Sequence, residues 1–120
     1  MKKKVLSTLL SVLIVFGWGW AQIEESIPDA PSHLRAFTRL DGAMGVTELS
    51  WHDESDNELS FRILRADNGK EFHEVALVGA NTRKYDDKVG KYSIGGFVYK
   101  VCAFNQAGDS EDSNIVSVWY

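Results

Sequence analysis

The sequence has few of the residues that build specialised scaffolds. Its 120 residues include one cysteine, so an intrachain disulfide is excluded. Two prolines and ten glycines are too few for a collagen-like or low-complexity chain. Hydrophobic residues make up 44% and charged residues 25%, a balance that favours one folded globular domain over a disordered chain.

Basic residues are also in the minority. Lys and Arg total 13 against 17 Asp and Glu, which gives a net charge of −4. Three of the lysines, at positions 2–4, precede the folded region, and without them the net charge is −7. Phosphate backbones and anionic lipids repel such a chain, so nucleic acid is excluded as a partner.

The first 21 residues have the three parts of a secretory signal peptide. A basic start at residues 2–4 leads into an apolar stretch at residues 5–16, and small residues follow at Gly19 and Ala21. The pattern predicts cleavage between Ala21 and Gln22 and export to the periplasm or the cell exterior. A retained membrane anchor is the alternative, but the stretch is shorter than the roughly 20 apolar residues that span a bilayer. No membrane insertion is therefore expected after cleavage.

From residue 31 onward, apolar residues recur with a period of two, which is typical of half-buried β-strands. The polar residues 22–30 form a lead-in. Asn68-Gly69 predicts a hairpin, which favours a strand where the following residues also show helical spacing. The pattern predicts an all-β fold, a seven-stranded antiparallel sandwich of two sheets over residues 31–120. Its strands are expected at 32–38, 46–51, 59–65, 72–78, around Tyr85, 97–105 and 115–119.

The side chains predicted to face the core alternate along these strands. In the strand at 46–51, Glu48 and Ser50 alternate with them and point to water, as one buried face requires. The predicted inward residues are Leu34, Ala36, Thr47, Leu49, Trp51, Leu59, Phe61, Ile63, Phe97, Tyr99, Val101 and Ala103.

Several strings, taken in order, resemble a fibronectin type III domain of the bacterial kind. They are Pro31-Ser32-His33-Leu34-Arg35-Ala36, Leu49-Ser50-Trp51, Phe61-Arg62-Ile63, Tyr85-Asp86-Asp87 and the run from Tyr99 to Ser110. The resemblance implies an immunoglobulin-like sandwich with strands A, B and E in one sheet and C, C′, F and G in the other. Phe97 stands where the family commonly has a tyrosine, so the hydrogen bond of that tyrosine hydroxyl is expected to be missing.

The acidic loop at residues 53–58 and the histidines are the candidate chemical sites. The loop's four carboxylates suggest calcium or a glycosidase acid pair, but their spacing is not that of an EF-hand. We expect the loop side chains to cap the turn by accepting backbone N–H groups. His33, His52 and His73 fall on different segments, so surface positions without a metal are expected. No catalytic motif is present in the sequence, and neither a cofactor nor enzyme activity is expected.

The outer face of the C, C′, F and G sheet is the predicted interaction surface. Residues that alternate with the inward positions form a partly apolar patch, of the kind that commonly marks an interface. Scattered surface apolar residues are the alternative. The single thiol could also link two copies as a disulfide dimer, unless neighbouring side chains hide it. The candidate partner-binding face comprises Leu64, Val98, Cys102, Phe104, Ile115 and Trp119.

Together these features predict a secreted, non-catalytic module. It is expected to bind a protein partner, or to have a structural role, at the cell envelope or outside the cell. A carbohydrate-binding module is the alternative, because exposed aromatic side chains at Tyr92, Trp119 and Tyr120 could stack on sugar rings.

Overall fold

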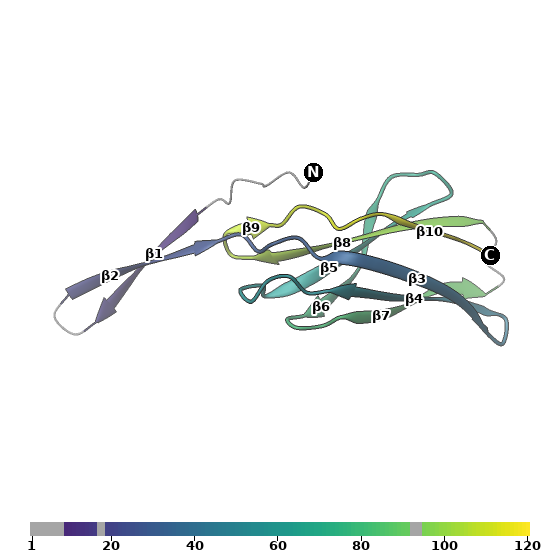
Figure 1. Ribbon diagram of the computed structural model, residues 1–120, viewed down its shortest axis with the longest axis horizontal. Helices are drawn as coiled ribbons and strands as arrows, with labels where there is room; N and C mark the ends of the chain where they lie inside the picture. The colour runs from purple at the N-terminus through teal and green to yellow at the C-terminus, as the bar shows by residue number, and fades with distance from the viewer. Residues whose placement is uncertain (1–8, 17–18, 92–94) are drawn as a thin grey trace.

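The structure is a computed structural model that describes residues 9–16, 19–91 and 95–120, and these residues form ten β-strands (Figure 1). Eight of the strands build two antiparallel sheets that pack as a sandwich, which confirms the predicted all-β fold. One sheet has the order β3 (Ser32–Asp41), β4 (Met44–His52), β7 (Lys84–Lys91). The other has the order β10 (Val116–Trp119), β8 (Gly96–Asn105), β5 (Ser60–Asp67), β6 (His73–Gly79).

The division of the strands between the sheets is the one that the resemblance implied. β3, β4 and β7 correspond to strands A, B and E, and β5, β6, β8 and β10 to C, C′, F and G. The predicted count of seven strands was too low. A two-residue strand, β9 (Gly108–Asp109), also pairs with β8, and two further strands precede the sandwich.

Those two strands, β1 (Leu9–Phe16) and β2 (Gly19–Ser26), form an antiparallel hairpin that extends away from the sandwich in Figure 1. The described part of the predicted signal peptide and the start of the predicted lead-in fall on this hairpin, and the predicted cleavage point lies within β2; residues 1–8 and 17–18 of the signal peptide lie outside the described residues. Signal-peptide cleavage stays a prediction. No helix among the described residues is long and apolar enough to cross a membrane.

The core lies between the two sheets and follows the predicted alternation. Trp51 from β4 is 2% exposed and packs against Phe61 from β5, with ring centroids 5.7 Å apart. Leu59 is the exception to the predicted set, because it precedes β5 and is 53% exposed. The buried core cluster comprises Leu34, Leu49, Trp51, Phe61, Ile63, Phe97, Tyr99, Val101, Ala103 and Val118.

The turn after β5 takes the predicted hairpin geometry. Asn68 and Gly69 both have positive φ angles, of 50° and 77°, as a type I′ turn requires. The Lys70 N–H closes the turn on the Asp67 carbonyl at 3.0 Å. The Asn68 side chain then accepts a hydrogen bond from the Gly96 N–H at 3.0 Å, which holds the turn against the start of β8.

A buried polar network joins the two sheets in the interior. Asp87 on β7 accepts hydrogen bonds from Arg65 Nη1 at 2.7 Å and from the Tyr99 hydroxyl at 2.6 Å. Arg65 also donates to Asp67 at 2.6 Å. Burial and the bond to Asp87 raise the pKa of Tyr99 above its ordinary value. Phe97 has no hydroxyl, so it cannot form the hydrogen bond that the family's tyrosine makes from this position. Tyr99, the next inward residue along β8, instead supplies a buried hydroxyl contact that the sequence did not predict.

Candidate functional site

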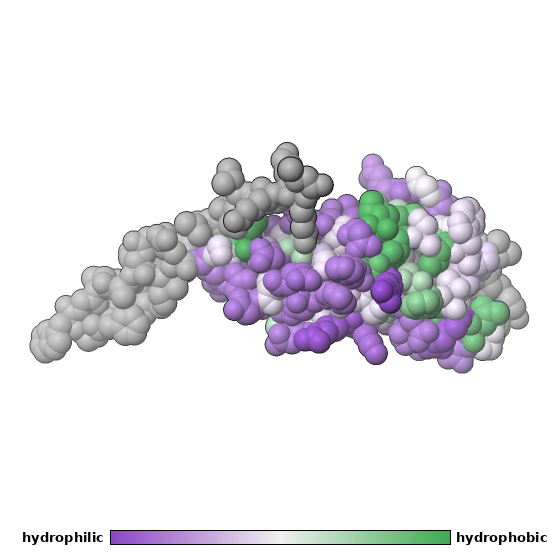
Figure 2. Space-filling model, viewed as in Figure 1, coloured by the Kyte–Doolittle hydropathy of each residue, from purple (hydrophilic) through white to green (hydrophobic). Residues whose placement is uncertain are grey.

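The predicted partner-binding face lies on the outer side of β5, β8 and β10, but its six residues differ widely in exposure. Ile115 and Trp119 are 59% and 75% exposed. Leu64, Val98 and Phe104 are half-buried, and Cys102 is buried. In the view of Figure 2, hydrophobic side chains form separate small areas among hydrophilic ones. Because Cys102 is buried and three others are half-buried, the six residues do not make one continuous exposed apolar surface.

Arg62 is the first of two charged side chains that interrupt this face. It lies opposite Cys102 in the β5–β8 register. Its guanidinium is 4.1 Å from the ring centroid of Phe104 and pairs with Glu74 at 2.8 Å and with Asp109 at 3.4 Å. The Arg62 guanidinium therefore makes a cation–π contact with the Phe104 ring and covers part of it, so the ring is half-buried.

Lys100 is the second charged interruption. It lies opposite Leu64 in the same register. Its ammonium pairs with Asp112 at 2.9 Å and lies 4.3 Å from the ring centroid of Phe72. Sequence alternation placed both charged residues on the outer face but could not show how far their side chains reach over it.

Cys102 has little access to solvent. The residue is 3% exposed, and burial, with the carboxylates of Asp109 and Asp112 nearby, raises the pKa of its thiol to about 11. A thiol with a raised pKa in this position is a poor nucleophile, because the thiolate is the reactive form. The predicted disulfide dimer would need the sulfur at the surface of both copies, and the structure places it under its neighbours.

Trp119 has the largest exposed fraction of the six residues and borders a hollow. Its indole lies over Gly96, where a Cβ atom would be 3.0 Å from the ring atom Cζ2. Glycine at this position therefore leaves room for the ring to lie against the backbone of β8. The hollow beside the ring has a volume of about 260 Å³ and is lined by Asn68, Gly69, Gly96, Phe97, Val98, Ser117, Val118 and Trp119.

The position of the hollow follows from the ends of several strands. β10 is an edge strand, so Trp119 has no paired strand on its outer side within its sheet. The turn at Asn68 and Gly69 forms the opposite rim. Two residues of the predicted face, Val98 and Trp119, belong to this site, and Leu64, Cys102, Phe104 and Ile115 do not line it. The hollow brings together segments that are far apart in sequence, and no local pattern indicates it.

Trp119 stands apart from the other aromatic residues that were predicted to bind sugar. The Tyr120 hydroxyl is 2.9 Å from Thr47 Oγ1, and its ring packs edge-on against Phe97 at a centroid distance of 5.9 Å. Tyr120 is therefore held inside the end of the sandwich. Tyr92 lies outside the described residues. Of these three aromatic residues, Trp119 is the one that the described part of the chain shows as strongly exposed.

The acidic loop has the capping role that was predicted. Asp53 Oδ1 accepts a hydrogen bond from the Ser55 N–H at 3.1 Å, an Asx-turn. Glu58 is 7% exposed and accepts from the Ser55 hydroxyl at 2.8 Å and from the Asn81 N–H at 3.2 Å. Burial and the contact with Glu58 raise the pKa of Asp53. Burial acts in the same direction on Glu58, but its hydrogen bonds outweigh it and lower the pKa of that carboxyl.

The histidines are exposed, as predicted, but two of them are not separate. The rings of His33 and His52 stack with centroids 4.5 Å apart and planes inclined by 28°. Glu54 Oε1 is 4.0 Å from His52 Nδ1 and accepts a hydrogen bond from the Ser32 hydroxyl at 2.6 Å. His33 and His52 lie on different segments, as the sequence indicates, but the pairing of β3 with β4 brings these two segments together. His73 lies on β6 in the other sheet.

Comparison with known proteins shows the fold. No protein-family model and no curated protein sequence matches the chain. Among solved structures, it is similar to the sixth fibronectin type III domain of human fibronectin type III domain containing protein 3 (16% identity, 77% of this chain and 84% of that chain, TM-score 0.60). It is also similar to a Fn3-like protein from Clostridium thermocellum (20% identity, 78% of this chain and 93% of that chain, TM-score 0.60).

A third similar structure is a much longer chain, a beta-1,2-glucanase from Parabacteroides distasonis. The identity is 25% and the TM-score 0.61, over 83% of this chain but 15% of the glucanase chain. The chain therefore matches one part of that enzyme. Together these likenesses establish the fibronectin type III fold that the sequence motifs resembled.

Proposed function

We propose that this fibronectin type III domain is an exported, non-catalytic module that binds a protein partner at the cell envelope or outside the cell. The observation that carries the proposal is the indole of Trp119, which is 75% exposed beside a hollow of about 260 Å³. Water solvates such a large aromatic surface poorly, and tryptophan is enriched among residues that dominate binding energy at interfaces. Export is supported by the signal-peptide pattern of the first 21 residues.

The location of the contact surface is argued from what surrounds Trp119. Elsewhere on the outer sheet face, the charged side chains of Arg62 and Lys100 lie among the apolar ones, and both are held in ion pairs. A partner that covered those positions would have to desolvate charged groups, at a cost that often cancels the attraction. The described residues that line the hollow beside Trp119 carry no charge, so a partner that buries the indole and fills the hollow avoids this cost.

The first experiment tests the contact surface. The purified chain is biotinylated on its lysines and used to capture proteins from an envelope extract, in parallel with Trp119→Ala and Phe37→Ala variants. Phe37 is the matched control, since it is a 63% exposed aromatic residue on β3 in the other sheet. We expect a partner that is retained by the wild-type chain and by Phe37→Ala, and at least tenfold less by Trp119→Ala. Equal retention by all three chains would refute the assignment to Trp119.

The second experiment tests export. Cells that produce the chain are fractionated, and the N-terminus of the recovered protein is sequenced. We expect a protein outside the cytoplasm that begins at Gln22. Recovery from the cytoplasm with Met1 or Lys2 at its N-terminus would contradict the proposal.

A carbohydrate ligand is the second candidate function. It is favoured by the flat, exposed ring of Trp119 and by the similarity of this chain to parts of two enzymes with carbohydrate substrates in their names. Structures similar to this chain include the beta-1,2-glucanase and the pectate lyase PelI from Erwinia chrysanthemi, the latter also determined in complex with tetragalacturonic acid. A single indole contributes about one stacking contact, so the affinity would be low. A glycan array that gives no signal above that of Trp119→Ala would rule this candidate out.

A further inference from the structure

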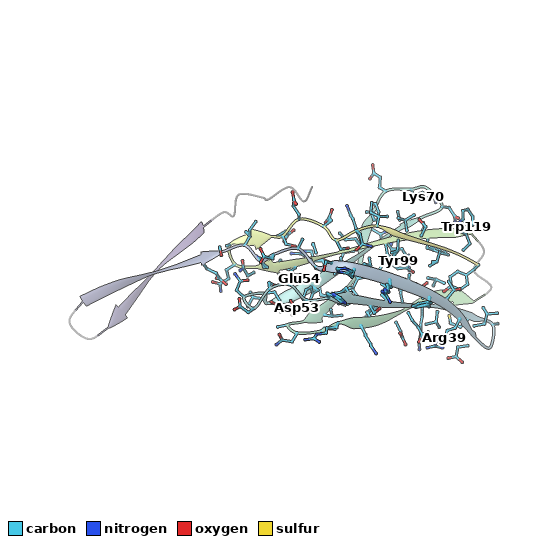
Figure 3. The ribbon with its side chains drawn as sticks, in the orientation of Figure 1. Arg39, Asp53, Glu54, Lys70, Tyr99 and Trp119 are labelled. Atoms are coloured by element: carbon cyan, nitrogen blue, oxygen red, sulfur yellow. The ribbon has the colours of Figure 1, made fainter. Side chains whose placement is uncertain are left out.

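Two imidazoles and a carboxylate gather at the end of the sandwich opposite Trp119. Figure 3 shows Glu54 and Trp119 at opposite ends. One ligand atom each from His33, His52 and Glu54 lies within 4.8 Å of the others, and all three residues are exposed. Neither the sequence motifs nor the proposed function accounts for this cluster.

We propose that His33, His52 and Glu54 bind a divalent transition-metal ion of the zinc type. Imidazole nitrogen and carboxylate oxygen are the donors that zinc prefers beside thiolate, and two histidines with one glutamate form a known type of three-ligand zinc set. Calcium and magnesium are disfavoured because they take oxygen ligands. Three protein ligands leave at least one coordination position for water or for a donor from another molecule.

A β-bulge brings the first histidine to the second. Ser32 pairs with His52 and Arg35 pairs with Ser50, so His33 and Leu34 together oppose Trp51 alone. Regular alternation would send Ser32 and His33 to opposite faces, but in the bulge the Ser32 hydroxyl lies 2.9 Å from His33 Nδ1, so the two side chains lie on the same side. In the bulge, Leu34 enters the core at 3% exposure, and the His33 ring is turned onto the ring of His52.

The backbone of His33 has an unusual conformation that maintains this arrangement. Its φ angle is +54°, in the left-handed region that residues other than glycine rarely adopt. Such a conformation is unfavourable for a residue other than glycine, and it persists because the pairing on both sides of the bulge fixes it. The stacked histidine pair is therefore set by the fold of β3 and β4.

Ser32 positions two of the three ligands. Its hydroxyl donates to Glu54 Oε1 at 2.6 Å and lies 2.9 Å from His33 Nδ1. The hydroxyl has one proton, which goes to the carboxylate, so His33 Nδ1 donates the proton in the second bond. Nε2 of His33 then keeps a lone pair of the kind that a metal ion needs. A hydrogen bond to the other ring nitrogen is a usual feature of histidine ligands in metal sites.

The distances are compatible with binding after a small closure. Tetrahedral zinc with bonds of about 2.0–2.1 Å requires ligand atoms about 3.3 Å apart. One ring nitrogen of each histidine and a Glu54 oxygen lie within 4.8 Å of one another, roughly 1.5 Å more than this, and rotation of the side chains can bring the ligand atoms closer. Because all three side chains are exposed, such rotations do not disturb the core.

The test is a zinc titration of the purified full-length chain, followed by calorimetry and by the change in Tm. We expect one zinc ion per chain and a rise in Tm. The variants His33→Asn, His52→Ala and Glu54→Gln should each weaken binding by about tenfold or more. Asparagine tolerates a positive φ angle, so His33→Asn removes the ligand without straining the bulge. His73→Ala removes an exposed histidine from the other sheet and should leave affinity unchanged.

Cobalt provides a second readout. Co²⁺ in place of zinc should give the visible absorption of a tetrahedral nitrogen–oxygen site, and His33→Asn should abolish that absorption while its circular dichroism matches that of the wild type. The proposal is overturned if the chain binds no zinc, or if His73→Ala weakens binding as much as His33→Asn does. Because Trp119 lies at the other end, these outcomes are independent of the partner experiments.

Discussion

Replacing Asp87 by asparagine is expected to destabilise the domain strongly. The Asp87 carboxylate, with 7% of its side chain exposed, pairs with Arg65 at 2.7 Å and accepts the Tyr99 hydroxyl at 2.6 Å. Asparagine keeps one acceptor oxygen but removes the charge, which leaves the guanidinium of Arg65 with Asp67 as its remaining anionic partner in the network. Arg65 itself is 15% exposed at the side chain, so solvent replaces little of the lost interaction.

The magnitude follows from these contacts. Removing one partner of a buried ion pair costs about 3–5 kcal/mol. The remaining pair between Arg65 and Asp67 places the expected loss at the lower end, about 3 kcal/mol. For a domain of this size, that loss lowers Tm by roughly 12–24 °C. Urea denaturation, followed by the fluorescence of the buried Trp51, measures the change in the free energy of unfolding.

Two further variants make the test specific. Asp86→Asn on the same strand removes an exposed carboxylate that pairs with Arg39 at 3.3 Å, with 52% of its side chain exposed, and should cost less than about 1 kcal/mol. Tyr99→Phe removes one hydrogen bond to the same carboxylate and should cost about 1.5–3 kcal/mol. The double variant of Asp87 and Tyr99 should be less destabilised than the sum of the single variants, because the two share a contact. If Asp87→Asn and Asp86→Asn have equal effects, the network does not stabilise the junction of the sheets.

Three other outcomes are expected. Trp51→Ala should lower the free energy of unfolding by about 3–5 kcal/mol, because its ring fills the core. Phe104→Ala should lower it by less, because that ring lies under Arg62 on the outer face. Equal losses in urea denaturation would contradict the assigned orientations. Cys102 should react with a thiol reagent only after unfolding, and non-reducing electrophoresis of the native chain should show no dimer. Burial raises the pKa of this thiol to about 11 from an ordinary 9.0, so the folded chain holds the proton to a higher pH than the unfolded chain does. The resulting stabilisation is complete below about pH 9 and is lost as the pH rises toward 11. Cys102→Ala should therefore reduce the loss of stability over that pH range.

The alternation of apolar and polar residues was sufficient to predict the sheets and most of the core. In a strand, neighbouring side chains point to opposite faces, so a run such as Phe97, Tyr99, Val101 and Ala103 fixes one buried face without knowledge of the partner strands. Leu59 fitted the same alternation and is exposed, because β5 begins one residue later. Periodicity cannot show where a strand begins.

The outer face was harder to predict because long charged side chains extend over the residues next to them and cover part of the surface there. Alternation with the inward residues puts Arg62 and Lys100 on this face, but their charged ends reach over neighbouring aromatic rings and toward acids on other segments. Those contacts depend on the distances between strands. The sequence pattern therefore predicted an apolar patch where the structure has an interrupted one with an exposed indole at its edge.

The chain's sequence determined its architecture: turn residues and a two-residue periodicity force paired strands, and the apolar face of each sheet can be buried only against the other. What the tertiary structure alone decided are the places where residues distant in the chain meet. The β-bulge turns His33 onto His52, and the pairing of sheets brings Arg65, Asp87 and Tyr99 together in the interior. The physical reason is that side-chain chemistry depends on separations of a few ångströms, and these are set by strand register and sheet packing rather than by local preference.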